Sequence, residues 1–229
     1  MADIEPYKYR DPKRLMTVLR VVVLVQLAVL AVSFVAFVLQ YHLLEDIRHG
    51  AFASHDEMMA AATAGDTRVR VLSVVELLVL PVALITFLVW VYRASANAHA
   101  LGAQGLASGA GMAVGCYFIP FVNLVSPAIN MSQVEKASRN APDWRQQRTW
   151  WPIPLWWTLW LTMSIGGYAV ALLTQEGEGI DAIETAVMLQ GGYKLVEVAA
   201  YILLLIVTAR ISRRQRDQHA GFGTDSASA

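Results

Sequence analysis

The sequence predicts an all-α polytopic membrane protein: a helical bundle of four transmembrane helices plus one broken re-entrant or interfacial segment. The chain of 229 residues is 56% hydrophobic and only 16% charged, whereas soluble domains carry roughly a quarter charged residues. Its apolar residues are also gathered into runs of about 20 residues, the length that crosses a bilayer as a helix. A soluble core would not need such runs, so we expect an integral membrane protein.

Four apolar runs are long enough to span the hydrocarbon layer. They cover residues 15–40, 71–92, 154–173 and 186–209. A polar, basic arm, residues 1–14, precedes the first run, and we expect it to be cytoplasmic. A tail, residues 217–229, follows the last, and we expect it to be disordered. Residues 15–216 therefore form a single predicted transmembrane helical domain.

Prolines mark the places where helices should be interrupted. Pro81 lies near the middle of the second span, where neighbouring helices can satisfy the carbonyl group that it frees. Within residues 111–140, Pro120 removes a backbone donor, and a serine followed by Pro127 is typical of a helix start. This segment is predicted to be a half-helix, a broken apex and a helix that returns along the surface.

The returning helix has an amphipathic pattern. Ile129, Val134 and Ala137 point to its apolar side. Glu135 and Arg139 are spaced i,i+4, which allows an ion pair on its solvent-facing side. We therefore expect this helix to lie at the membrane surface.

The basic residues indicate which side each loop faces, because Lys and Arg concentrate in cytoplasmic loops. If residues 111–130 do not cross the membrane, thirteen basic residues lie inside, against Arg48, Arg68 and Arg70 outside. If the segment crosses, five lie inside and eleven outside. We therefore expect a re-entrant segment and two cytoplasmic termini; a crossing segment is the alternative.

Three charged residues fall within the predicted spans. Glu76 and Lys194 lie at similar depth from the outer ends of their spans, and Glu197 follows Lys194 by three positions on one helical face. Charges in hydrocarbon are costly and therefore mark candidate functional sites. We interpret them as an interhelical ion pair that fixes packing. The alternative is a proton- or ion-coupled pathway with Glu197 as the titrating group.

A second polar set follows the second span. Trp90, Arg93 and Asn97 are spaced by three and four residues, so they share one helical face. We expect Arg93 and Asn97 to approach Asn123, whose amide can satisfy carbonyl groups freed around Pro120. The functional alternative is a site for phosphate or a lipid headgroup, because guanidinium groups match phosphate oxygens.

Other function classes lack their characteristic residues. Cys116 is the single cysteine, and His42, His49 and His55 are spaced by seven and six residues, which does not place them on one helical turn. No Ser/His/Asp set, HExxH or GxxxxGK[ST] motif occurs, and no stretch has the density of Lys and Arg that nucleic acids require. We expect no enzyme activity, catalytic residue, cofactor, metal or nucleic-acid partner.

Several stretches together resemble one family. WVYRASANAHALGAQGL, GMAVGCYFIPFVNLVSPAINMSQVEKASR, LWWTLWL and RISRRQ are similar to a family of bacterial membrane proteins catalogued as domain of unknown function 4328. The resemblance covers about residues 90–215. The two outer-side loops, residues 41–69 and 174–186, look specific to this chain. The matching positions are Trp90, Arg93, Asn97, Leu101, Gly102, Pro120, Asn123, Pro127, Met131, Trp157, Trp160 and Gln215. The resemblance implies a multi-pass protein of the bacterial inner membrane and supplies no catalytic residue.

The expected function is a non-enzymatic scaffold, adaptor or regulatory component of the membrane. The first alternative is a small ion- or proton-coupled transporter or channel subunit that uses Glu76, Lys194 and Glu197. The second is binding of lipid headgroups on the cytoplasmic side. The expected partners are membrane lipids, and either a second copy of the chain or another membrane protein.

Overall fold

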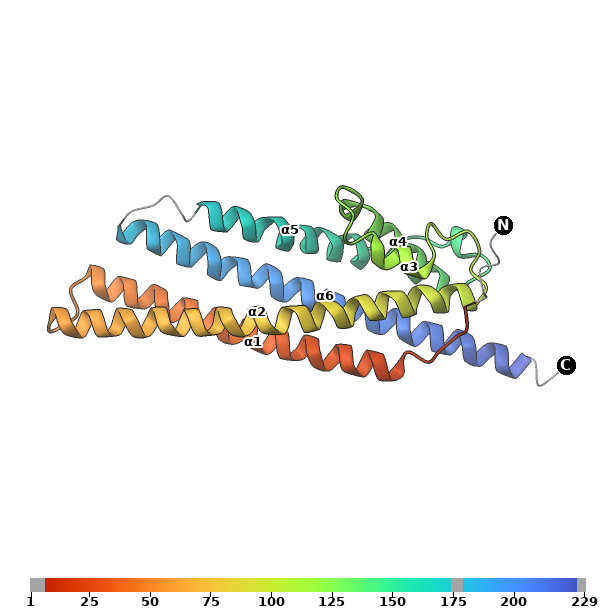
Figure 1. The fold of residues 1–229 in the computed structure, drawn as a ribbon, viewed down its shortest axis with the longest axis horizontal. Helices are drawn as coiled ribbons and strands as arrows, with labels where there is room; N and C mark the ends of the chain where they lie inside the picture. Colours follow the sequence, from red (N-terminus) through yellow and green to blue (C-terminus); the bar gives the residue numbers. More distant parts are fainter. Residues whose placement is uncertain (1–6, 174–178, 226–229) are drawn as a thin grey trace. The chain divides into compact units, whose positions relative to one another are not determined.

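The computed structural model describes residues 7–173 and 179–225, and these residues contain helices and no strands (Figure 1). The elements are α1 (Lys13–Arg48), α2 (His55–Ala100), α3 (Ala110–Gly115), η1 (Val122–Leu124), α4 (Ser126–Ala137), η2 (Trp144–Gln146), α5 (Pro152–Leu173) and α6 (Ile180–Asp225). The all-α prediction is therefore confirmed for the described part of the chain.

Three of the described helices, not the predicted four, are long and apolar enough to cross a membrane. They are α1, α2 and α6, whose most apolar windows have mean hydropathies of 2.9, 2.6 and 2.0. Helix α5 has a sufficient length of 22 residues. Its tryptophans, glycines and hydroxyl side chains lower its hydropathy, although tryptophan itself favours the membrane interface.

Two of the long helices extend beyond the predicted spans. Helix α2 joins the polar stretch before residue 71, the span and its extension into one helix of 46 residues that contains Pro81. The alanine-rich sequence before the span favours helix, so no break separates them. Helix α6 continues to Asp225, beyond residue 216, where we placed the end of the domain. The rest of the predicted tail lies outside the described residues, as do residues 1–6 and 174–178.

The described chain forms two compact units, and each contains parts of α1, α2, α5 and α6. The first unit contains residues 7–22, 83–157 and 203–225, and the second contains residues 23–82, 158–173 and 179–202. The short elements α3, η1, α4 and η2 all belong to the first unit, where α3 packs against α4 (Figure 1).

The helix break predicted around Pro120 is present in the first unit. Helix α3 ends at Gly115, and α4 begins at Ser126 with Pro127 in its first turn. Between them Phe121 has a φ of 62°, a left-handed conformation that is uncommon for residues other than glycine. Because proline has no N–H group to donate to the preceding turn, a helix cannot run unbroken through this segment.

In the second unit, helix ends are joined by apolar and charged contacts. Phe37 and Leu44 of α1 pack with Val187 of α6. Beside them Arg48, the last residue of α1, forms ion pairs with Asp181 and Glu184 in the first turns of α6. Arg48 thus joins the end of α1 to the start of α6.

Candidate functional site

Three charged side chains meet in the second unit. The Nζ of Lys194 on α6 donates to Oε2 of Glu76 on α2 at 2.7 Å, and to Oε2 of Glu197 at 2.9 Å. The exposed fractions of the Lys194, Glu76 and Glu197 side chains are only 12%, 19% and 17%. The structure therefore brings all three intramembrane candidates together, and we call them the charge triad.

The two helices position the charge triad through ordinary helical geometry. Lys194 and Glu197 are three residues apart on α6, so both lie on one face of that helix. Glu76 approaches from α2, on the N-terminal side of Pro81. The long aliphatic stem of Lys194 lets its ammonium group reach one oxygen of each carboxylate.

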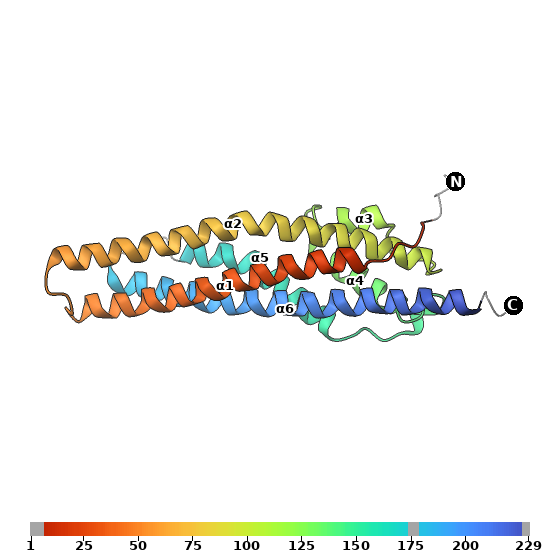
Figure 2. The same ribbon diagram turned by 90° about the horizontal axis from the view of Figure 1, so that it is seen from below.

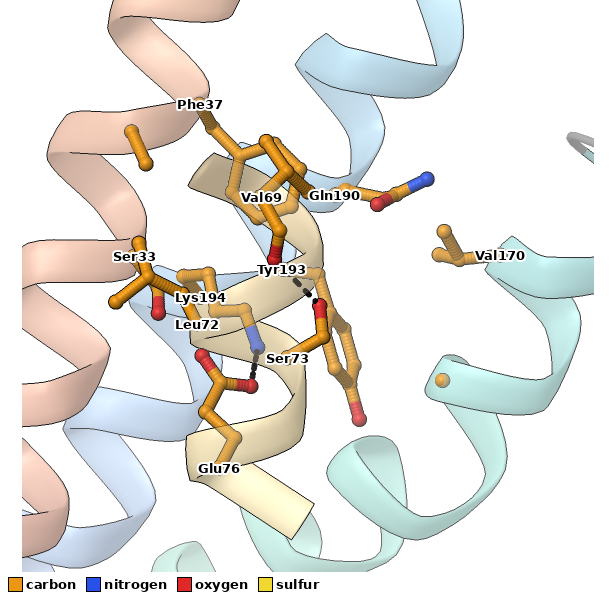
Figure 3. A pocket seen from close by; sticks show the side chains of 12 residues that line it. Ser33, Phe37, Val69, Leu72, Ser73, Glu76, Val170, Gln190, Tyr193 and Lys194 are labelled. Atoms are coloured by element: carbon orange, nitrogen blue, oxygen red, sulfur yellow. Dashed lines mark hydrogen bonds and ion pairs between the residues drawn. The ribbon is translucent and has the colours of Figure 1, made fainter. Parts of the chain in front are cut away.

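A cavity of about 430 Å³ lies beside the charge triad, lined by α1, α2, α5 and α6 (Figure 3). Its polar lining includes Ser33, Ser73 and Gln190 together with Glu76 and Lys194. Ser33 has an exposed fraction of only 2%, and its hydroxyl oxygen has no hydrogen-bond partner among the described residues. A buried hydroxyl without a partner is costly, so this wall of the cavity offers a hydrogen bond to an occupant.

Tyr193 closes another part of the cavity. Its hydroxyl group donates to the carbonyl oxygen of Met163 on α5. A Cβ atom at Gly167 would lie 3.0 Å from this hydroxyl oxygen, and one at Gly166 would lie 3.3 Å from the ring. The two glycines therefore leave the space that the Tyr193 side chain occupies between α5 and α6.

The charge triad holds one cationic group for two carboxylates. With both glutamates ionised it carries one excess negative charge, in surroundings where an uncompensated charge is costly. A proton or a small cation would restore neutrality. Among the described residues, no group of three or more His, Cys, Asp or Glu side chains is placed to hold a metal ion.

A second polar centre lies in the first unit around Asn97, which is fully buried. Its side-chain oxygen accepts from the backbone N–H of Arg10 at 3.0 Å, and its Nδ2 donates to the Arg10 carbonyl oxygen at 2.9 Å. The same Nδ2 lies 3.4 Å from Oε1 of Gln215, whose Nε2 donates to the carbonyl oxygen of Ala94 at 2.8 Å. One amide thus joins the N-terminal arm, α2 and α6.

Trp90, seven residues before Asn97 on α2, also makes a hydrogen bond to α6. Its indole N–H donates to the hydroxyl oxygen of Ser212 at 2.9 Å, and its ring is fully buried. Trp90, Asn97 and Gln215 all belong to the pattern on which the family resemblance was recognised. In the structure each of these three residues makes a hydrogen bond between α2 and α6.

The structure does not contain the expected hydrogen-bonded cluster of Arg93, Asn97 and Asn123. Among the described residues no hydrogen bond joins Asn97 to Arg93 or to Asn123. Seven residues are nearly two helical turns, so Trp90 and Asn97 share the buried face, whereas Arg93 is rotated by about 60° from it. Arg93 is accordingly half-buried.

Glu135 has a different environment from the one that its sequence pattern predicts. The expected pair with Arg139 forms, with 2.9 Å between Oε2 and Nη2. The carboxylate is nevertheless fully buried, not on a solvent-facing side, because Nε of Arg210 on α6 approaches Oε1 at 3.2 Å. Arg210 also stacks on the ring of Trp150, 4.0 Å from its centroid. Helical periodicity within α4 carries no signal for a partner that comes from α6.

Comparison of the chain with known protein families found a match. A family model described as a domain of unknown function, DUF4328, matches residues 53–213. This match begins well before residue 90. It includes residues 53–69 of the first outer-side loop and the whole of the second, so the expectation that both loops lie outside the family pattern is wrong. No curated protein and no solved structure matches the chain. Because the family model covers most of its length, this protein belongs to the DUF4328 family.

Proposed function

We propose that this chain is a non-enzymatic regulatory component of the bacterial inner membrane whose state depends on protonation of the charge triad. The observation that carries the proposal is the position of Lys194 between two largely buried carboxylates. Ionisable residues inside membrane segments commonly serve as proton relays or ion sites, because keeping them there is costly.

The chemistry follows from the unequal number of charges. Lys194 neutralises one carboxylate, so the other gains most from taking up a proton. We assign that role to Glu197, because the ion pair of Lys194 with Glu76 joins two helices, whereas Lys194 and Glu197 lie on the same helix. Protonation of Glu197 leaves a neutral set in which Lys194 is held by Glu76 alone. The adjacent cavity, with the unpartnered hydroxyl of Ser33, supplies space for a water molecule beside the triad.

Infrared spectroscopy of the full chain in liposomes tests this proposal. A pH titration of the wild type should show a carboxylic-acid carbonyl band that Glu197→Gln removes and that Glu57→Gln, at an exposed position in the same unit, leaves in place. If Glu197→Gln leaves every such band unchanged, the triad is only a packing ion pair. A pH-sensitive dye inside the same liposomes separates regulator from transporter. We expect no proton flux above that of empty vesicles, and a flux that Glu197→Gln abolishes would favour the transporter.

We further propose a multi-pass arrangement in which α5 is a fourth crossing, residues 111–130 are re-entrant, and both termini are cytoplasmic. The distribution of basic residues supports it, because this arrangement places thirteen Lys and Arg residues inside and three outside. At a rise of 1.5 Å per residue, the 22 residues of α5 reach about 33 Å, which suffices for the hydrocarbon layer.

Cysteine labelling in intact cells tests this arrangement. In a Cys116→Ala background, we expect a membrane-impermeant maleimide to label Ala53→Cys and Asp181→Cys, but not Gln146→Cys until the cells are lysed. All three positions are exposed in the structure, so failure to label reports sidedness and not burial. Labelling of Gln146→Cys together with protection of Asp181→Cys would mean that residues 111–130 cross the membrane.

A further inference from the structure

A basic cavity of about 570 Å³ lies in the first unit, between the first turns of α1 and residues 206–216 of α6; these two segments run side by side in Figure 2. Five cationic side chains and one aromatic ring line it: Lys13, Arg20, Arg210, Arg213, Arg216 and Trp150. No acidic residue is among its lining residues. We call it the basic cavity; it is separate from the charge triad, which belongs to the second unit.

One of these cations, Arg210, is held in place by two other side chains. Arg210 uses its Nε to contact the buried carboxylate of Glu135, and its guanidinium plane stacks on Trp150. Stacking and a charge-assisted hydrogen bond restrict the side chain, while its terminal amino groups remain suited to a further acceptor. The basic cavity therefore includes a cation that is ordered before any ligand arrives.

Positive charge exceeds negative charge around the basic cavity. Glu135 is already shared between Arg139 and Arg210. Beside the cavity, burial and then the neighbouring charge of Arg210 lower the pKa of Arg214 from its ordinary value. Burial is the larger cause of the lowered pKa, and the further lowering by Arg210, Arg139 and Arg213 agrees with the excess of cationic side chains around the cavity, which an anionic ligand would relieve.

The remaining lining consists of three apolar side chains and the hydroxyl residues Thr17 and Ser212. Met16 on α1, and Ile206 and Ala209 on α6, belong to the hydrophobic stretches of those helices. Cations and apolar groups thus line one cavity at the place where two membrane-compatible helices become basic. A soluble phosphate compound would use only the cations, whereas a phospholipid uses both parts, with its phosphate group on Arg and Lys and its glycerol and first methylene groups on the apolar wall.

We propose that the basic cavity binds the phosphate group of an anionic phospholipid. Its volume falls within the range of pockets that hold small ligands and suits a headgroup with the start of its acyl chains. Arg213 and Arg216 are the residues to change, because both side chains are exposed and neither makes a hydrogen bond or ion pair within the described part of the chain.

Native mass spectrometry of the purified full chain tests the proposal. Titration with phosphatidylglycerol should show one preferred bound lipid, and phosphatidylcholine should bind much more weakly. Arg213→Gln with Arg216→Gln should weaken phosphatidylglycerol binding by roughly 25-fold, about fivefold for each cation removed. The matched control is Lys8→Gln with Arg14→Gln, which removes two exposed cations from the same unit outside the cavity and should change binding by less than about twofold.

Three results would overturn the proposal. Equal losses in both double variants would mean a general electrostatic attraction, and an unchanged affinity in Arg213→Gln with Arg216→Gln would mean that the lipid binds elsewhere. The third result comes from a competition experiment, in which glycerol 3-phosphate or inorganic phosphate is added to the lipid-bound protein. Displacement of the lipid by either compound, at the lipid's own binding concentration, would identify a site for soluble phosphates. Circular dichroism of each variant checks that its helical content is retained.

Discussion

Glu135→Gln is expected to lower the free energy of unfolding by roughly 3 kcal/mol, the lower end of the range for breaking a buried ion pair from one side. The carboxylate is fully buried between Arg139 and Arg210, so its loss leaves two guanidinium groups close together without their shared anion. The lower end applies because both arginines are partly exposed, and because Arg139 also donates to the carbonyl oxygen of Arg148.

Thermal unfolding in detergent, followed by circular dichroism, measures this effect. For a chain of this size we expect the midpoint to fall by roughly 6 to 12 °C. Asp181→Asn is the matched acid-to-amide control. Its carboxylate side chain is 91% exposed, and its partner Arg48 keeps Glu184, so the change should cost less than about 1 kcal/mol. A Glu135→Gln protein as stable as Asp181→Asn would show that Glu135 does not hold α4 to α6.

Lys194→Met should have an effect of similar size, roughly 3 to 5 kcal/mol, because it removes the only cation of the charge triad. Glu76 and Glu197 would then face each other in largely buried positions without compensation. Methionine keeps much of the aliphatic stem, so the loss reports charge more than packing. The measurement is again the unfolding midpoint of detergent-extracted protein.

A double-mutant cycle separates the ion pair from packing. Glu76→Gln with Lys194→Met should be more stable than the sum of the two single losses predicts, by about 1 to 3 kcal/mol. Adding Glu197→Gln to that double variant should recover more stability, because no charge then remains in the triad. Purely additive losses in the cycle would contradict a direct interaction between Glu76 and Lys194. The cycle bears on stability alone, so it complements the infrared titration that tests protonation.

The sequence predicted those features that depend on local chemistry. Apolar runs of spanning length predicted α1, α2 and α6, and Pro120 and Pro127 predicted the break between α3 and α4. Equal depth from one membrane face was enough to suggest that Glu76 and Lys194 could meet, since neighbouring spans place such residues at one level. These inferences succeeded because each needs only the geometry of one helix or the length of one span.

Partners from distant parts of the chain required the tertiary structure. Asn97 was assigned to the right helix but to the wrong neighbours, because its amide is used by the N-terminal arm and Gln215. The i,i+4 spacing predicted the pair of Glu135 with Arg139, yet only the packing of α6 buries that carboxylate against Arg210. The basic cavity likewise combines the first turns of α1 with residues 206–216 of α6. Sequence by itself determined where the apolar spans and the break around Pro120 lie. Which helix faces meet depends on contacts between segments far apart in the chain, and periodicity within one helix does not encode them.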